Sequence, residues 1–353
     1  MANVKQFLKK KDIEISAKRY GIDALSAMAQ GLFASLLIGT ILTTIGNLAG
    51  LEWLVTIGGY ASAVKGPAMA VAIGFALKAP TLELFSLAAV GYAADTLGGA
   101  GGPLAVLVIT IIACEIGKLV SKETKVDIIV TPGVTIVVGS LLSMALAPPI
   151  GKAASALGNA IMWATDLKPF LMGIIVSVIV GIALTLPISS AAICAALSLT
   201  GLAGGAALAG CCANMVGFAI LSFKANGVGG LFAQGIGTSM LQMGNIVKKP
   251  VIWLPVILAS AVTGPIATCI FHLEMNGAAV SSGMGTCGLV GQIGVFSGWV
   301  SDIAAGAKAS ITAFDWIGLI LISFILPAVI TWIIGKGFKG AGIIKDEDLK
   351  LDL

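Results

Sequence analysis

Long apolar runs separated by short polar or glycine-rich breaks dominate this chain. Together with the lysines, glycines and prolines between them, these runs predict about ten transmembrane helices. The runs are much longer than the roughly ten residues of a barrel strand, so they indicate an all-α polytopic membrane protein. The predicted spans are residues 23–48, 52–77, 81–97, 104–119, 128–148, 169–186, 188–204, 207–223, 250–271 and 314–335.

Two glycine-rich regions depart from this pattern. One is "KANGVGGLFAQGIGTSMLQMGNIVKKP" (224–250), and the other begins "FHLEMNGAAVSSGMGTCGLVGQIG" (271–294) and continues to Trp299. Both are too polar to face lipid and too apolar for simple solvent loops. Irregular backbone at membrane depth survives only when it is buried in protein or lines a cavity. We therefore expect re-entrant Gly-rich hairpins here, and an amphipathic helix at the outer interface over 151–169.

The lysines predict the orientation of the chain. Those near the span ends fall mostly on the side of the basic arm at residues 1–20, and only Lys152, Lys168 and Lys308 fall opposite. Positive residues accumulate on the cytoplasmic side, so both termini are expected there. The expected organisation is a cytoplasmic arm (1–20), a transmembrane scaffold (21–223), a transmembrane region with substrate-site elements (224–335) and a short solvated cytoplasmic tail (336–353).

Composition excludes several classes of protein. The chain is 58% hydrophobic and only 11% charged, and its mean hydropathy is +1.03, which no water-soluble globule shows. The net charge of +4 reports orientation, and no nucleic-acid-binding pattern accompanies it. The chain lacks Walker A, Gly-x-Ser-x-Gly and His-Glu-x-x-His motifs, so neither ATP hydrolysis nor soluble-type catalysis is expected. The six cysteines have no metal-ligand spacing and are interpreted as small buried hydrophobes. No cofactor and no metal is expected.

The only histidine of the chain, His272, lies two residues before Glu274. In extended backbone, positions i and i+2 point the same way, so both side chains can reach one ligand. A carboxylate accepts hydroxyl hydrogens and an imidazole both donates and accepts, which suits a neutral polyhydroxyl molecule. The alternatives are a His–Glu pair that only holds the loop in place and a loop in water.

Amide and hydroxyl side chains are concentrated in "QGIGTSMLQMGNI" (234–246), with Asn226, Asn276 and Gln292 as further candidates. Glycines allow close backbone approach and amides can bind hydroxyls. The alternative is a packed hairpin whose amides bond to its own backbone. The candidate substrate-binding residues of this run are Gln234, Thr238, Ser239, Gln242 and Asn245.

Ionisable residues inside the predicted spans form a separate group of candidates, because buried charges are costly in a membrane. Lys65, Glu83, Asp95 and Glu115 form either scaffold ion pairs or a proton path. Ser189 and Ser190 follow a proline, and helix capping explains them better than ligand binding.

Four stretches resemble a known membrane family, the second type of phosphotransferase-system enzyme IIC. They are "TLPISSAAI" (185–193), "NGVGGLFAQGIGTSMLQMGNI" (226–246), "WLPVILASAVTGPIAT" (253–268) and "GMGTCGLVGQIG" (283–294), and the resemblance covers about residues 20–340. It implies a multi-pass, homodimeric, sugar-permease-like protein of the bacterial cytoplasmic (inner) membrane. In better-known enzyme IIC families a glutamate and a histidine near re-entrant elements bind sugar hydroxyls, and His272 and Glu274 are chemically suited to that role.

The chain departs from some relatives because it has no fused enzyme IIB domain, so a separate protein would have to donate any phosphoryl group. The leading hypothesis is a permease that binds a small polar, sugar-like solute in one cavity built from 224–250 and 271–294 and moves it by alternating access. Two other hypotheses stay open: a solute-sensing membrane regulator, and a proton- or cation-coupled carrier of an organic anion.

Overall fold

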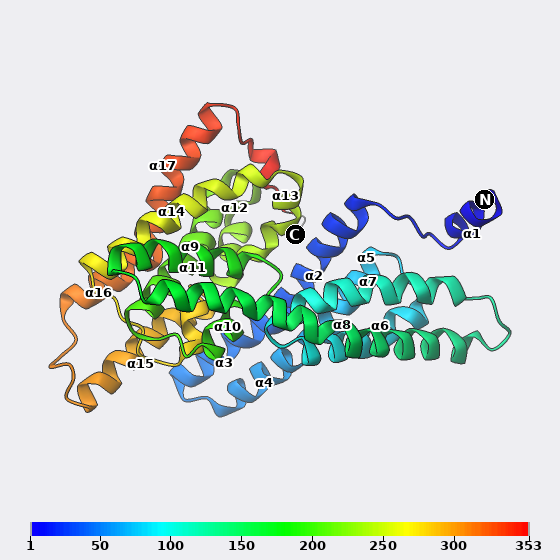
Figure 1. Cartoon of the computed structure of the whole chain (residues 1–353), viewed down its shortest axis with the longest axis horizontal. Helices are drawn as coiled ribbons and strands as arrows, with labels where there is room; N and C mark the ends of the chain where they lie inside the picture. Colours follow the sequence, from blue (N-terminus) through cyan, green and yellow to red (C-terminus); the bar gives the residue numbers. More distant parts are fainter. Residues whose placement is uncertain (1, 352–353) are drawn as a thin grey trace. The chain divides into compact units, whose positions relative to one another are not determined.

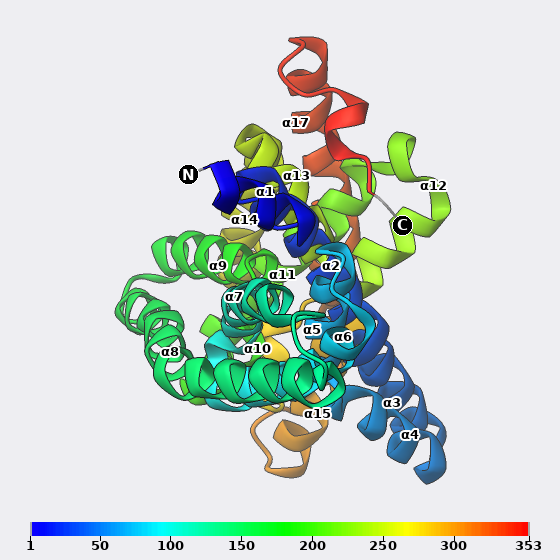
Figure 2. The same cartoon turned by 90° about the vertical axis from the view of Figure 1, so that its right-hand side faces the viewer.

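The structure is a computed structural model that describes residues 2–351. It divides into two compact units: unit 1 contains residues up to Gly39 and Thr56–Ala153, and unit 2 contains Thr40–Val55 and the residues from Ala154 onward. The described residues are almost entirely helical (Figures 1 and 2). The one antiparallel bridge within them joins Gly201 to Met275. The all-α prediction is therefore confirmed.

Four helices pack together in unit 1: α2 (Ala24–Leu32), α5 (Lys65–Ala76), α6 (Thr81–Gly98) and α7 (Gly102–Val120). Gly66 and Gly91 allow α5 and α6 to touch through their backbones, because a Cβ on Gly91 would lie 2.3 Å from the Gly66 carbonyl oxygen. The remaining elements are α1 (Ala2–Lys10), η1 (Arg19–Asp23), η2 (Phe33–Leu37) and η3 (Gly99–Gly101). The two units are divided within three helices: α3 (Ile38–Ala49), α4 (Glu52–Ala63) and α8 (Asp127–Thr165). In α4 the division falls between Val55 and Thr56.

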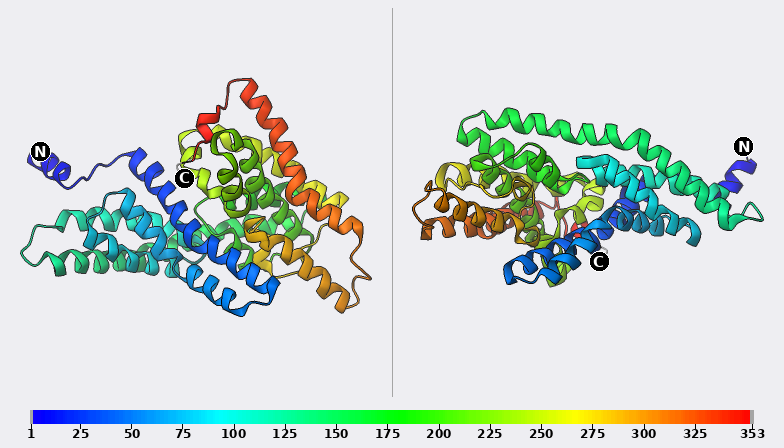
Figure 3. Two further views of the ribbon diagram at one scale, coloured as in Figure 1. Left: turned by 180° about the vertical axis from the view of Figure 1, so that it is seen from behind. Right: turned by 90° about the horizontal axis from the view of Figure 1, so that it is seen from below.

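Unit 2 is built around α11 (Gly201–Leu221), which contacts α9 (Pro169–Thr185), α14 (Leu254–Pro265) and α17 (Leu326–Gly340). Figure 3 shows the orange-to-red α16–α17 stretch running beside green helices of this unit, among them α11. The other helices of this unit are α10 (Ser190–Ala196), α12 (Phe223–Phe232), α13 (Met243–Lys248), α15 (Val290–Ala304) and α16 (Ala313–Ile320). Short π or 3₁₀ turns join them: η4 (Ala233–Gly237), η5 (Ser239–Gln242), η6 (Pro250–Trp253), η7 (Ile266–Ile270), η8 (Ala279–Gly283), η9 (Cys287–Leu289), η10 (Leu321–Ile325) and η11 (Asp346–Leu349).

Six helical stretches within residues 2–351 are long and apolar enough to cross a membrane: Arg19–Asn47, Thr81–Val120, Asp127–Thr165, Gly201–Leu221, Pro250–Ile270 and Ala313–Gly340. The stretch Thr81–Val120 contains both α6 and α7, which match the predicted spans 81–97 and 104–119. By length and composition the structure thus supports a polytopic membrane protein with six candidate spans.

Several predicted helix boundaries are wrong. The predicted span 52–77 is two helices, because the backbone leaves helical geometry at Val64. The predicted span 188–204 is the short α10 followed by the start of α11, where Gly201 has a positive φ of 62°. The separate interfacial helix expected over 151–169 does not exist as such, because α8 continues through Pro148 and Pro149 to Thr165.

The two glycine-rich regions are broken, as their composition predicts. Residues 223–248 pass through α12, η4, η5 and α13, with non-helical backbone at Gly227 and extended backbone at Thr238. Residues 271–289 contain only the short turns η8 and η9. Gly230, Gln234, Ser239, Ser282 and Cys287 are nevertheless buried. Protein side chains therefore cover much of this irregular backbone.

Candidate functional site

Helix α11 links the candidate residues of unit 2. It has 21 residues, which corresponds to a length of about 30 Å at 1.5 Å per residue. Its glycines bring neighbouring backbone into direct contact: a Cβ on Gly205 would lie 1.7 Å from the Leu273 carbonyl oxygen, and one on Gly210 would lie 1.8 Å from that of Ser177. Small residues allow this approach in membrane helices. The N-terminal end of α11 therefore lies at residues 273–275, which include Glu274.

His272, Glu274 and Asn276 gather at this first end. The bridge between Gly201 and Met275 holds their segment, in which His272 has a positive φ of 44°. The side chains of His272 and Glu274 are exposed and those of Leu273 and Met275 are buried. Asn276 Nδ2 donates to Glu274 Oε2 at 3.0 Å and to Asp302 Oδ2 at 2.9 Å. One amide thus holds two carboxylates near each other.

A pocket of about 210 Å³ lies at this end and is lined by His272, Glu274, Asn276, Trp299 and Asp302, among other residues. Lys308 pairs with Asp315 at 2.9 Å on its wall. Trp299 contacts Trp316 edge to face, with ring centroids 5.4 Å apart. Carboxylates, an amide and an indole suit a small polyhydroxyl solute, because they offer acceptors, donors and a flat apolar face. We call this the pocket end.

Sequence reasoning missed Trp299 and Asp302 as pocket residues. They lie three positions apart on α15, a spacing that places two side chains on one face of a helix. The available signal in the sequence was this spacing of an indole and a carboxylate within a run of mostly small and apolar residues. Their proximity to Glu274 depends on the chain folding back between residues 276 and 302.

Four amide side chains gather near the other end of α11, and we call them the amide cluster: Asn226, Gln234, Gln242 and Asn245. Gln234 Nε2 donates to Ser222 Oγ at 2.8 Å and to the Gly230 carbonyl at 3.0 Å. Gln242 Nε2 donates to Gln234 Oε1 at 2.9 Å, and Asn245 Nδ2 donates to Gln242 Oε1 at 2.9 Å. Three of the four amides therefore form a hydrogen-bonded row.

The amide cluster also binds the segment 345–351, which folds back beside α12 and α13 (Figures 1 and 2). The Leu349 carbonyl accepts from Asn226 Nδ2 at 2.9 Å and from Gln242 Nε2 at 3.0 Å. The Lys350 carbonyl accepts from Asn245 Nδ2 at 2.8 Å. Lys345, Glu347 and Lys350 are exposed as expected of a solvated tail, but Leu349 is buried and its carbonyl bonds to the buried Gln242 amide, so the segment is not free in water.

A buried polar network lies between the two ends. Asn214 Nδ2 donates to Ser260 Oγ at 3.1 Å and to the Gly210 carbonyl, while its Oδ1 accepts from Trp253 Nε1 and Thr185 Oγ1, each at 3.2 Å. Thr185 Oγ1 lies 2.7 Å from Ser239 Oγ. Asn214 and Ser239 are fully buried. Sequence reasoning missed Asn214, whose signal was a lone amide in an otherwise apolar helix.

Thr238, Ser239 and Gln292 occupy positions between the ends. Thr238 Oγ1 accepts from the Met240 amide at 3.1 Å and so begins η5. Gln292 Nε2 donates to Ser323 Oγ at 2.9 Å, and its buried Oε1 has no hydrogen-bond partner within residues 2–351. The structure therefore does not bring all the predicted residues into one pocket. It places them at the two ends of α11 and along its length.

Ser189 and Ser190 fill structural roles, as expected. Ser189 Oγ accepts from the Ala192 amide at 3.2 Å at the start of α10. Ser190 Oγ donates to the Gly283 carbonyl at 2.7 Å. Both residues therefore hold α10 in place.

The ionisable candidates belong to unit 1. Lys65 Nζ lies 3.4 Å from Asp95 Oδ2, and Lys118 Nζ lies 3.5 Å from Glu115 Oε2. Glu83 is fully buried, and its carboxylate oxygens have no hydrogen-bond partner in the described part of the chain. Three of the four candidates thus take part in ion pairs, and Glu83 does not.

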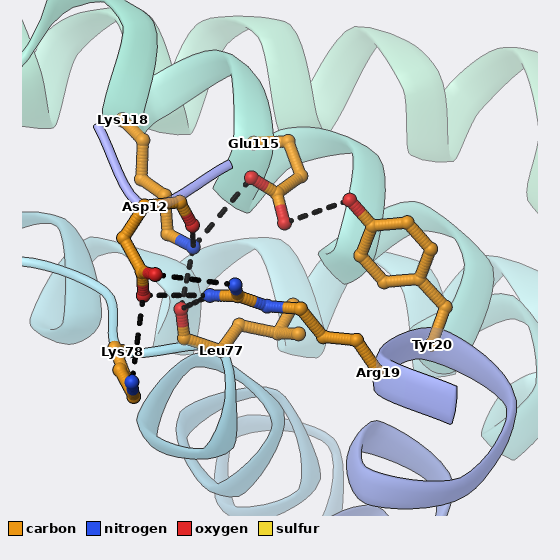
Figure 4. A network of polar contacts seen from close by, with 7 residues as sticks. All are labelled: Asp12, Arg19, Tyr20, Leu77, Lys78, Glu115 and Lys118. Carbon is orange, nitrogen blue, oxygen red and sulfur yellow. Dashed lines mark hydrogen bonds and ion pairs between the residues drawn. The ribbon is translucent and has the colours of Figure 1, made fainter. Parts of the chain in front are cut away.

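Figure 4 shows that Glu115 and Lys118 belong to a larger network. Arg19 Nη2 donates to Asp12 Oδ2 at 2.9 Å and to the Leu77 carbonyl at 2.7 Å, and Lys118 Nζ donates to that same carbonyl at 2.5 Å. Tyr20 donates to Glu115 Oε1 at 3.0 Å. The Arg19 guanidinium lowers the pKa of Asp12 below its ordinary value, so Asp12 is ionised at neutral pH. The network attaches residues 12–20 to the ends of α5 and α7.

No curated protein and no solved structure matches this chain. The family described as "Phosphotransferase system, EIIC" matches residues 22–351, nearly the whole chain. With its apolar helices, polar broken segments and buried amides, the chain thus belongs to the phosphotransferase-system EIIC family of membrane permease components in sugar transport.

Proposed function

We propose that this protein binds a small polyhydroxyl solute and moves it across the bilayer along α11 by alternating access. The observation that supports this proposal most directly is the series of polar groups along that helix. It runs from the pocket end through the Asn214 network to the amide cluster. Beyond the carboxylates of the pocket end, the donors and acceptors of the Asn214 network and the amide cluster are uncharged, so they exchange hydroxyl partners without the cost of burying a charge.

The pocket end is the proposed first binding position. Glu274 and Asp302 accept hydroxyl hydrogens, Asn276 orients both carboxylates, and His272 donates or accepts at the rim. Gln234, Thr238, Gln242, Asn245 and Gln292 serve later positions. The end of α11 at the amide cluster, here called the amide end, faces the cytoplasm in this proposal, because positive residues accumulate on the cytoplasmic side of a membrane. Four lysines lie near the amide end, Lys224, Lys248, Lys249 and Lys336, whereas Lys308 lies at the pocket end.

The proposed topology has about ten crossings, with residues 224–250 and 271–294 as re-entrant elements. The burial of their irregular backbone supports this, since unpaired amides are not tolerated against lipid. A homodimer in the bacterial cytoplasmic membrane and a separate enzyme IIB-type phosphoryl donor complete the proposal. Both termini would then lie in the cytoplasm.

Uptake by proteoliposomes tests the proposal. A panel of radiolabelled hexoses, pentoses and hexitols would be supplied with and without phosphoenolpyruvate and the soluble phosphotransferase proteins. We expect accumulation of one sugar as its phosphate. Glu274→Gln should reduce the uptake of that sugar at least tenfold, about the effect of losing one charged hydrogen bond. The matched control is Glu14→Gln, which changes an exposed carboxylate. Equal uptake by Glu274→Gln and wild type would remove the pocket end from the proposal.

One observation favours a second function, ion-coupled uptake. Glu83 is buried without a hydrogen-bond partner in residues 2–351, and Lys65–Asp95 is a half-buried ion pair of the same unit. A carboxyl group in such surroundings is a candidate for proton binding. Uptake that needs a proton gradient, yields no phosphorylated sugar and fails in Glu83→Gln would favour this function over the phosphotransferase one.

A further inference from the structure

The segment 345–351, "KDEDLKL", is polar enough to be free in water, yet the fold holds it against unit 2. After α17 the chain reverses, and the amides of Ile343 and Ile344 donate to the Phe338 carbonyl at 3.0 and 3.3 Å. The Leu349 side chain is then fully buried. Ordering a terminal segment costs conformational entropy, so specific contacts must offset that cost.

Main-chain recognition is the first of these contacts. Asn226 Nδ2 donates to the Leu349 carbonyl at 2.9 Å, and Asn226 Oδ1 accepts from the Leu351 amide at 2.8 Å. One side-chain amide therefore pairs with a C=O and an N–H two residues apart, much as a neighbouring strand would. Gln242 and Asn245 add donors to the Leu349 and Lys350 carbonyls. The segment makes the short 3₁₀ turn η11 over Asp346–Leu349 and becomes extended at Lys350, so residues 349–351 pair with this surface through their main chain.

Charge complementarity is the second contact. Lys249 Nζ lies 2.6 Å from Asp348 Oδ2, and Lys339 Nζ lies 2.5 Å from Asp346 Oδ1 while also donating to the Leu221 carbonyl. The two aspartates alternate with Glu347, which is exposed and makes no side-chain hydrogen bond or ion pair with the residues described. The docking surface therefore favours an acidic segment with carboxylates two positions apart.

The bound segment also occupies the groups that a solute would need. The donors of Gln242 and Asn245 are engaged with the Leu349 and Lys350 carbonyls and with neighbouring amide oxygens. A hydroxyl oxygen and a main-chain carbonyl compete for the same N–H groups, because both are neutral acceptors. The pocket end has no equivalent cover, since Glu274 and His272 are exposed.

We propose that the amide cluster, with Lys249 and Lys339, is a docking surface for the 345–351 segment of the same chain, and that this segment acts as a latch. The latch closes the amide end of the solute path while the pocket end is open. The closing role rests on the proposed function, whereas the docking does not. The segment must leave Gln242 and Asn245 before a solute can bind there.

Hydrogen–deuterium exchange of the full-length protein in detergent, without any sugar, tests the docking. We expect the amides of 345–351 to be protected in the wild type. Asn226→Ala and Asp348→Asn should each accelerate their exchange by about tenfold, the effect of one lost hydrogen bond or charged contact. Glu347→Gln, which removes an unengaged carboxylate, should change nothing. Unprotected exchange in the wild type would overturn the proposal.

A reporter cysteine tests the closing role. Gly235 lies beside Gln234, and a Cβ there has only an ordinary contact at 3.5 Å with Ala219, so Gly235→Cys fits without displacing backbone. Cys269→Ala removes the exposed natural thiol. A membrane-impermeant maleimide should label Cys at position 235 several-fold faster when Asn226→Ala or Asp348→Asn is added, and no faster with Glu347→Gln.

The two readouts separate the possible failures. Faster exchange of 345–351 with unchanged labelling at position 235 would show docking without closure and would overturn the latch. Neither measurement uses a sugar, so a protein that transports none of the tested sugars would contradict the proposed function while the docking result stands. Wild-type sugar uptake combined with an unprotected 345–351 segment would retain the function and remove the latch.

Discussion

Both ends of α11 carry polar side chains that could bind a hydroxyl-rich solute, but they differ in what those side chains already contact. At the pocket end, Glu274 and His272 are exposed and Asn276 bridges two carboxylates beside a pocket of about 210 Å³. At the amide end, Gln234 and Gln242 are fully buried, and main-chain carbonyls of 349–350 satisfy Gln242 and Asn245. Polar groups at one end are open to a ligand, and those at the other end are already bound to protein.

This difference shows why polar composition alone does not locate a binding site. Both segments are glycine-rich and carry amides or carboxylates, so their sequences indicate the same chemistry. Only the partners of each donor distinguish an available group from an occupied one. Substitutions at one end at a time therefore test whether the two ends differ in this way.

The largest effect is expected from Gly205→Ala. The new Cβ would lie 1.7 Å from the Leu273 carbonyl oxygen, so the 272–276 segment must move away from α11. Overpacking of this kind costs roughly 1–3 kcal/mol or more, and sugar binding at the pocket end should be lost. Thermal unfolding and sugar uptake measure the two effects. Gly229→Ala, where a Cβ meets nothing within 4 Å, is the control and should be neutral.

An intermediate effect is expected from Asn276→Asp. The substitution replaces the donor that bonds to Glu274 and Asp302 at 3.0 and 2.9 Å with a third carboxylate. Repulsion should separate the three acids and weaken sugar uptake by about tenfold, or roughly 1.4 kcal/mol. Exchange protection of 345–351 should stay at the wild-type level. A matching loss of protection there would show that the two ends are not independent.

The smallest effect is expected from the pH dependence of the latch. The hydrogen bond from Lys249, with Lys345 nearby, lowers the pKa of Asp348 below its ordinary value of 3.8. Its stabilisation is therefore complete above that ordinary value and disappears as the pH falls through the lowered pKa. For a partly exposed ion pair we expect about 0.5–1 kcal/mol.

Melting temperatures of wild type and Asp348→Asn measure this contribution. They should differ by about 1–2 °C at pH 7 and converge only as the pH falls through the lowered pKa of Asp348, where this carboxyl becomes as neutral as the asparagine amide. A difference that stays constant with pH would show that the carboxylate charge does not hold the segment. Glu347→Gln should melt with the wild type at every pH.

The sequence predicted the class of fold and much of its segmentation. The apolar runs, with the glycines and prolines between them, place α6 and α7 nearly residue for residue, and the glycine-rich compositions of 224–250 and 271–294 identify the broken segments. Local patterns suffice here because hydropathy and glycine content act within one or two turns. Prolines misled the prediction at Pro148 and Pro149, where α8 continues through both residues.

The candidate residues were predicted by type but not by arrangement. Sequence reasoning selected Gln234, Gln242 and Asn245 together with Glu274, which suggested one pocket, whereas α11 separates them. Sequence reasoning also missed Asn214, because a single amide side chain in an apolar helix does not indicate which residues form hydrogen bonds with it. Those partners, Thr185, Trp253 and Ser260, come from three other elements.

Hydrophobicity and family motifs are properties of the linear chain, so the sequence alone identifies an all-helical membrane protein of the EIIC family. Which polar groups are open and which are engaged follows from the packing of the helices. The pairing of Asn226 with residues 349 and 351, more than 120 positions away along the chain, depends on how the helices pack. No local pattern contains that information, since a hydrogen bond is fixed by distance in space.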